Sequence, residues 1–399
     1  MRPRKRAFGL LLGAGVLFLI GTNVQAGWLY VLSALLLGAV VAGLLLPFAA
    51  LRGLCAELVA PEEAWQGGEA MVELVLTSRA RGVRWSVVAA DEHLERAEVF
   101  VSSIARGERV EVATLRTPGR RGFVQTHAVQ VRSSAPFGVA ERRRRLPVRA
   151  ETLVLPRIFP LGALPFVDPV GTTEAAIHSA PRRGHGPEYL GVREYRTGDS
   201  MRHVHWPLTA RHGQVMVREF EEERTRRLAV VVDTERDTGQ EWTPLDRVCC
   251  VAASVLDAAL AHGHGARLLG ALPGGEVGVL SRADQDELLR WLAGLTPSGV
   301  SLAGVLAGLG TPELRGVETV VAAFPTWGDL DAAPLAEAVD GVLRHVTRVV
   351  CVPVVGARTP PGSVEALVSS LAGVGADVRP WVEGEDLSAA LGLGAEVGA

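Results

Sequence analysis

The stretch RLAVVVD, residues 227–233, decides how the C-terminal part of this chain folds. Its five consecutive apolar residues, 228–232, offer no polar face to solvent. Such a run is typical of a strand that a parallel sheet buries on both faces. Strands and helices alternate after it, so the sequence predicts a doubly wound α/β domain over residues 227–399. We expect helices over 245–262, 283–295, 331–344 and 363–374, a further helix from about 301, and strands over 266–272, 275–281, 318–324, 348–355 and 377–382.

Asp233 ends the first of these strands. Ligands of open α/β sheets bind beyond the carboxyl ends of the strands. The sequence therefore predicts a ligand-binding site at the edge of the sheet formed by Asp233 and the segment that follows Phe324.

Residues 186–220, GPEYLGVREYRTGDSMRHVHWPLTARHGQVMVREF, gather charges of both signs around aromatic side chains. Burying such charges is costly unless each is paired, so the segment is either a set of structural ion pairs or a recognition surface. The pattern predicts a short helix near 201–211 and a strand over 214–221. His203 and His205 alternate, but positions i and i+2 diverge on a helix, so we assign no histidine site there.

This segment resembles the signature of the domain of unknown function 58 family, whose members are bacterial membrane-associated proteins. A looser resemblance extends upstream through SSAPFG at 133–138 and LVLPR at 153–157. The residues that match the family pattern are Glu188, Gly191, Arg193, Glu194, Tyr195, Gly198, Asp199, Arg202, Trp206, Ala210 and Arg211.

The resemblance implies a layout for nearly the whole chain. A membrane hairpin comes first, a β-rich region and the signature follow, and a domain similar to a von Willebrand factor A domain comes last. The resemblance implies no established reaction and no catalytic residue. It does imply a protein partner, a MoxR-type AAA+ ATPase.

The charges of the signature leave two interpretations open. Three arginines could pair with three acids to hold the segment on the α/β domain through bidentate contacts. They could instead face a partner, because arginine and tryptophan are favoured at interface hot spots. The six residues concerned are Arg193, Arg202, Arg211, Glu188, Glu194 and Asp199.

A metal site is the second candidate. Von Willebrand A domains often hold Mg²⁺ in an Asp-x-Ser-x-Ser loop, and oxygen ligands suit such a hard cation. Here the loop reads DTERD, which keeps Asp233 and puts Glu235 and Asp237 at the serine positions; Thr326 and Asp329 follow a later strand without the usual arrangement. The alternative is a structural loop that binds no metal.

Alternating apolar and polar residues predict a β-rich domain over 53–156, either a sandwich or an open barrel. Arg142 to Arg145 could form a lipid-headgroup or nucleic-acid patch, and we favour a solvated strand end. The clearest predicted strands are 69–78, 83–91, 108–117 and 122–134.

Two apolar stretches, 7–20 and 28–51, predict a helical hairpin that enters the lipid bilayer between residues 7 and 51. The second is long enough to span a bilayer, and the first spans it if the helix extends to about Val24. Basic residues flank both outer ends, in MRPRKR and at Arg52, and the connecting loop has none. The positive-inside rule then puts both ends of the hairpin in the cytoplasm. A cleaved signal peptide is the competing interpretation of the first stretch.

Several chemistries find no residues to support them. Lys5 is the one lysine of the sequence, which excludes a Walker A motif and a Schiff-base lysine from the domains. The cysteines, Cys55, Cys249, Cys250 and Cys351, show neither zinc nor redox spacing. No Gly-x-Ser-x-Gly elbow is present. A net charge of −3 gives no general attraction to nucleic acid.

The sequence thus predicts a non-enzymatic adaptor in the cell membrane, without a required cofactor. It has a hairpin at 1–52, a β-rich domain at 53–156, a linker with the signature at 157–226 and the α/β domain at 227–399. Cytoplasmic docking of a MoxR-type ATPase in cell-envelope assembly is the leading function. One alternative is an enzyme that uses Glu188 or Asp199 as acid or base; the other is a Mg²⁺-dependent adhesion module.

Overall fold

The computed structural model describes residues 2–3, 5–162, 164, 166–167, 183–195, 204–221, 227–239, 242–271, 277–281, 285–326, 331–356, 359–360 and 362–392. The chain forms two compact units. Unit 1 comprises Met1–Arg157 with Gly239–Asp246 and Leu292–Leu295, and unit 2 comprises Ile158–Thr238, Arg247–Trp291 and Thr296–Ala399.

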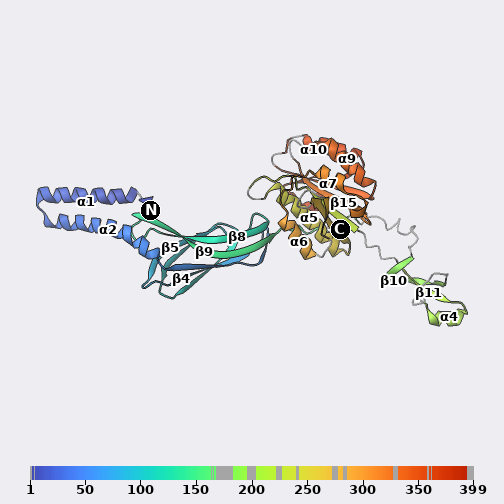
Figure 1. The fold of residues 1–399 in the computed structure, drawn as a ribbon, viewed down its shortest axis with the longest axis horizontal. Coiled ribbons are helices and arrows are strands. Elements are labelled where there is room, and N and C mark those ends of the chain that lie inside the picture. The colour runs from blue at the N-terminus through green and yellow to red at the C-terminus, as the bar shows by residue number, and fades with distance from the viewer. Residues whose placement is uncertain are drawn as a thin grey trace, which may run out of the picture. The chain divides into compact units, whose positions relative to one another are not determined.

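Two antiparallel helices open unit 1, α1 (Lys5–Val24) and α2 (Gly27–Leu51) (Figure 1). Both are long and apolar enough to cross a membrane. At about 1.5 Å per residue, α2 is about 37 Å long, which exceeds the roughly 30 Å of a bilayer's hydrocarbon core. Most of their large apolar side chains are exposed, as expected for helices whose surface is matched to lipid rather than to a protein core.

The helices continue directly into the β-rich module, which we define as residues 54–155. Ala7 and Val40 of the two helices pack with Val139 in a small buried cluster. Leu51, the last residue of α2, is buried in the main core of the β-rich module. The pair of helices is therefore anchored in the β-rich module by apolar contacts at the end where both helices meet it.

Two sheets share that core, which is the arrangement of a β-sandwich, and all of their strand pairs are antiparallel except β3 with β9. One sheet has the order β2-β4-β7, and the other has the order β1-β9-β8-β5-β6 with β3 beside β9. The four strands predicted most clearly correspond to β4, β5, β7 and β8. The strands are β1 (Arg2–Pro3), β2 (Leu54–Val59), β3 (Glu63–Trp65), β4 (Ala70–Ser78), β5 (Arg84–Asp91), β6 (Ala97–Ile104), β7 (Arg109–Arg116), β8 (Gly122–Ser133) and β9 (Ala140–Leu155).

The β-rich module also encloses a polar network that the sequence does not reveal. The guanidinium of Arg116 makes a bidentate ion pair with Asp91, at 2.7 and 3.0 Å, and both side chains are 1% exposed. His93 lies beside them, and its ring nitrogens contact the hydroxyls of Thr126 at 3.1 Å and Thr152 at 2.9 Å. The network satisfies the buried charges, which would otherwise be costly.

The α/β module has a sheet of order β14-β13-β12-β15-β16-β17, in which β18 also pairs with β16. All pairs are parallel except β13 with β14. The strands are β12 (Arg227–Val232), β13 (Gly265–Ala271), β14 (Val277–Ser281), β15 (Thr319–Pro325), β16 (Arg348–Val355), β17 (Asp377–Val378) and β18 (Trp381–Val382). The helices are α5 (Pro244–Ala261), α6 (Gln285–Gly294), α7 (Leu302–Gly308), α8 (Thr311–Leu314), α9 (Ala332–Leu343), α10 (Ser363–Gly373) and α11 (Leu387–Ala390).

Helices cover both faces of this sheet. Helices α7, α9 and α10 share one core with alternate residues of β12, β15 and β16, and α5 and α6 lie on the other side of β15 (Figure 1). This explains why the middle strands are apolar without alternation. The predicted order of strands and helices is found throughout the described part of this module.

The described part of the segment before the signature packs on the α/β module. Phe159 donates its N–H to Ser254 Oγ at 2.9 Å and makes an edge contact with the ring of Trp381. Leu164, Phe166 and Val167 are buried. These contacts hold the described residues of this segment, 158–162, 164, 166 and 167, on the module, where the sequence predicts a linker.

Candidate functional site

The carboxyl ends of β12, β15 and β16 meet at one edge of the α/β sheet, where the sequence predicts a ligand site. Asp233 follows β12, and its N–H donates to Ala323 O of β15 at 3.0 Å. Thr326 follows β15, and its N–H donates to Val354 O of β16 at 3.0 Å. The parallel register thus brings Asp233 and Thr326 to the same edge.

Asp233 is a buried carboxylate, 4% exposed, at this edge. Its Oδ1 accepts a hydrogen bond from the N–H of Glu235 at 2.9 Å. Burial raises the pKa of Asp233 to about 6, and the negative charge of Glu235 acts in the same direction, while that hydrogen bond and the charge of Arg236 oppose it. A carboxyl group that titrates near neutral pH could exchange a proton or accept a cation.

Hydroxyl groups surround the edge, and they are paired with one another. Thr234 Oγ1 lies 2.8 Å from Ser298 Oγ, and Thr326 Oγ1 lies 2.7 Å from Thr359 Oγ1. Ser298 and Thr359 come from loops far along the chain, and no sequence motif marks them. The one sequence signal for Ser298 is its place in the loop that follows the predicted helix 283–295.

The predicted metal ligands do not converge. Among the described residues, no group of three or more His, Cys, Asp or Glu side chains is arranged to hold a metal ion. Asp233 is buried at the sheet edge, whereas Asp237 is partly exposed and accepts a hydrogen bond from Thr238 N at 3.0 Å. Glu235 is partly exposed as well. Asp233, Glu235 and Asp237 thus form no three-carboxylate site in this geometry, and Asp329 lies outside the described residues.

The signature forms a small hairpin of its own in unit 2, which we call the signature hairpin. Strand β10 (Arg183–Glu194) pairs with β11 (Met216–Glu221), and α4 (Trp206–His212) lies between them in sequence. Glu188, Gly191, Arg193 and Glu194 belong to β10. Gly198, Asp199 and Arg202 lie outside the described residues.

Local sequence explains why α4 forms where it does. His205 Nδ1 accepts the N–H of Leu208 at 3.2 Å and so caps the first turn. Gly213 ends the helix with φ 69°, a left-handed conformation that glycine adopts without strain. Thr209 Oγ1 then accepts the N–H of Met216 at 3.0 Å, which joins α4 to β11.

The aromatic residues of the signature are exposed. Trp206 is 62% exposed on α4, and Tyr195 is 37% exposed at the end of β10. Ala210 and Arg211 are exposed on α4 as well. The two large aromatic side chains of the signature therefore lie on the surface of the signature hairpin.

Comparison with known proteins supports the family resemblance in part. Residues 191–358 match the family described as "Protein of unknown function DUF58". The match begins within the signature hairpin and runs through β16. The "Uncharacterized protein YeaD" of Bacillus subtilis (strain 168) is 28% identical over 149 residues, 37% of this chain and 36% of YeaD. The matched stretch thus spans about a third of that relative.

Likeness to solved structures is weak. The CARDB domain of a Pyrococcus furiosus protein has a TM-score of 0.21 and 14% identity, covering 26% of this chain and 87% of that domain. The PilB minor pilin of Streptococcus sanguinis has a TM-score of 0.30 and 10% identity, covering 78% of this chain and 85% of the pilin. Neither similarity carries an argument about fold or function.

Proposed function

We propose that this protein is a membrane-anchored, non-enzymatic adaptor that docks a protein partner through its signature hairpin. The observation that carries the proposal is the exposure of Trp206 and Tyr195 within the segment that matches the family pattern. Large aromatic side chains supply much of the binding energy of protein interfaces. Exposing them on a small, locally capped hairpin presents them to a partner.

The anchor is the first part of the proposal. It rests on α1 and α2, which are long and apolar enough to cross a bilayer. The start of α1 and the C-terminal part of α2 pack against the β-rich module. The basic residues in MRPRKR and at Arg52 favour a multi-pass arrangement with both modules on the cytoplasmic side of the cell membrane. Carbonate extraction and protease protection of membrane vesicles test the anchor and the sidedness independently of any partner.

The partner is the second part. The family resemblance points to a MoxR-type AAA+ ATPase and to cell-envelope assembly or maturation, and the α/β module would then correspond to a von Willebrand A-like domain. The order of its strands and the position of Asp233 at the carboxyl edge are compatible with that assignment.

Affinity capture from native membranes tests the docking surface. The full-length protein is compared with Trp206→Ala and with a control, Trp85→Ala, because Trp85 is also 62% exposed but lies in the β-rich module. We expect an AAA+ ATPase with the wild type and the control, and at least a tenfold loss with Trp206→Ala. Equal capture by all three folded proteins would show that the signature hairpin is not the docking surface.

A second candidate function is favoured by one observation, the buried carboxylate of Asp233 at the sheet edge. It corresponds to the Mg²⁺-dependent adhesion module, in which a cation at Asp233 binds a partner's acid. Ligand binding stabilises the folded state. Under this alternative Mg²⁺ would raise the melting temperature of the wild type and leave that of Asp233→Ala unchanged. The enzyme alternative keeps Glu188 and Asp199 as its acid/base candidates and has no comparable observation in its favour.

A further inference from the structure

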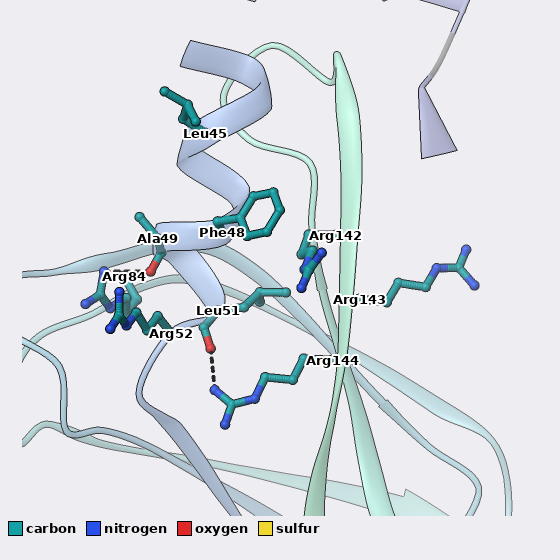
Figure 2. Close-up of a pocket in the computed structure, with 9 residues that line it drawn as sticks. All are labelled: Leu45, Phe48, Ala49, Leu51, Arg52, Arg84, Arg142, Arg143 and Arg144. Atoms are coloured by element: carbon teal, nitrogen blue, oxygen red, sulfur yellow. Dashed lines mark hydrogen bonds between the residues drawn. The ribbon is translucent and has the colours of Figure 1, made fainter. Parts of the chain in front are cut away.

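An open pocket of about 580 Å³ lies where α2 enters the β-rich module, and arginines from three elements line it (Figure 2). Arg52 follows α2, Arg84 opens β5, and Arg142, Arg143 and Arg144 belong to β9. The sequence favours a solvated strand end for the β9 arginines. The fold instead gathers them with Arg52 and Arg84 around the last turn of α2.

Helix capping accounts for part of this cluster. Arg84 Nη1 donates to Ala49 O at 2.6 Å, and Arg144 Nη1 donates to Leu51 O at 3.0 Å, so both arginines satisfy carbonyls at the end of α2 (Figure 2). The C-terminus of a helix carries only about half an elementary negative charge. It cannot balance the guanidinium groups collected here.

Carboxylates balance only one member of the cluster. Arg143 points away from the helix (Figure 2). It pairs with Glu141 at 2.5 Å. No carboxylate among the described residues forms an ion pair with Arg52, Arg84, Arg142 or Arg144. The Nε of Arg84 is buried and has no hydrogen-bond partner. The cluster therefore carries a net positive charge, and planar guanidinium groups bind phosphate oxygens through paired hydrogen bonds.

The pocket has an apolar wall beside its basic one. Phe48 stacks its ring against the guanidinium of Arg142, with 4.1 Å from Cζ to the ring centroid. Leu45, on the same helix, is 63% exposed, and Phe48 is 44% exposed. A ligand that combines a phosphate with a hydrocarbon chain matches both walls.

We propose that this arginine pocket binds the phosphate headgroup of an anionic phospholipid, whose acyl chains lie along Leu45 and Phe48 of α2. This inference rests on the proposed membrane anchor, since it places the end of α2 at the level of the lipid phosphates. The backbone of Arg2 in β1 pairs with Glu141 of β9, next to the β9 arginines of the pocket. The site would fix the depth and orientation of the anchor in an acidic membrane.

The test uses the full-length protein in a mild neutral detergent, titrated with dioctanoyl phosphatidylglycerol and with dioctanoyl phosphatidylcholine. The variant is Arg52→Gln with Arg142→Gln, which spares the two helix-capping arginines. The control is Arg109→Gln with Arg149→Gln, which removes the same charge from exposed arginines of the β-rich module outside the pocket. We expect the wild type and the control to prefer the anionic lipid, and the pocket variant to bind it about 10- to 30-fold more weakly.

Several outcomes would overturn the proposal. Equal affinity for both lipids would do so, as would equal weakening in the control. Inorganic phosphate or a short oligonucleotide that binds the wild type as tightly as the anionic lipid would assign the pocket to a different anion. Carbonate extraction of the same proteins keeps the anchor separate: a wild type that stays in the membrane without preferring anionic lipid refutes the pocket alone, whereas a wild type that is extracted refutes the anchor.

Discussion

At the scale of single residues, the described buried charges are held by specific partners. His93 is fully buried in the β-rich module, and desolvation lowers its pKa; the neighbouring positive charge of Arg116 also lowers it, while Asp91 opposes both. The hydroxyls of Thr126 and Thr152 complete its surroundings. The neutral imidazole is therefore the form that the folded module accommodates.

Acidification should destabilise the β-rich module through His93. The unfolded chain takes up a proton near pH 6.5, while the folded form resists it, so stability present above pH 6.5 is lost as the pH falls through the lower folded pKa. Thermal unfolding between pH 7.5 and pH 5 measures this. His93→Gln should show a smaller loss over that window than the wild type. An identical pH profile in the two proteins would show that the folded state tolerates a charged His93.

Asp233 should have the opposite dependence on pH. Its folded pKa, about 6, lies above the ordinary 3.8, so its stabilising contribution is complete at low pH and is lost as the pH rises through 6. Asp233→Asn keeps the acceptor for Glu235 N and carries no charge. With a chelator present, it should be about 3 kcal/mol more stable than the wild type at pH 7.5 and equal to it below about pH 4. Equal stability at both pH values would contradict the burial of a charged carboxylate.

At the scale of elements, α2 lies close to Val139, the residue before β9, at Gly43. A Cβ atom added at Gly43 would lie 2.7 Å from Val139 Cγ2 and 2.8 Å from Val139 Cβ. Gly38, on the same helix, has open space around it. Alanine at Gly38 changes only the helix propensity of α2, whereas alanine at Gly43 also changes its packing against Val139.

Gly43→Ala should therefore loosen the helices from the β-rich module. The overpacked contact costs roughly 1–3 kcal/mol, which outweighs the gain in helix propensity of about 1 kcal/mol. Melting in detergent should show a lower transition temperature for Gly43→Ala and an unchanged or higher one for Gly38→Ala. If both variants behave alike, Gly43 makes no close contact with Val139.

Periodicity predicts those elements whose burial is regular along the chain. Strand β16 and helix α10 were predicted to within a residue, because continuous or helical apolar patterns fix them. Strand β9 was not predicted at its full length, since its run of arginines was interpreted as a solvated strand end. The polar network around Arg116 and the arginine pocket join residues that are far apart in sequence, and no local pattern encodes such contacts.

At the scale of the whole molecule, each unit contributes a separate part of the proposed role. Unit 1 carries the two apolar helices, the β-rich module and the arginine pocket. The signature hairpin and the matched family segment lie mainly in unit 2. An adaptor of this kind would hold its anchor and its docking surface on different units, so variants in one should leave the function of the other intact.

Direct binding of the purified full-length protein to a purified MoxR-type ATPase from the same organism tests the adaptor proposal most directly. The comparison uses the wild type, Trp206→Ala and Trp85→Ala on a biosensor surface. We expect the wild type and Trp85→Ala to bind with equal affinity, and Trp206→Ala to bind at least about 30-fold more weakly. Absence of binding by the folded wild type, or equal affinity of all three proteins, would contradict it.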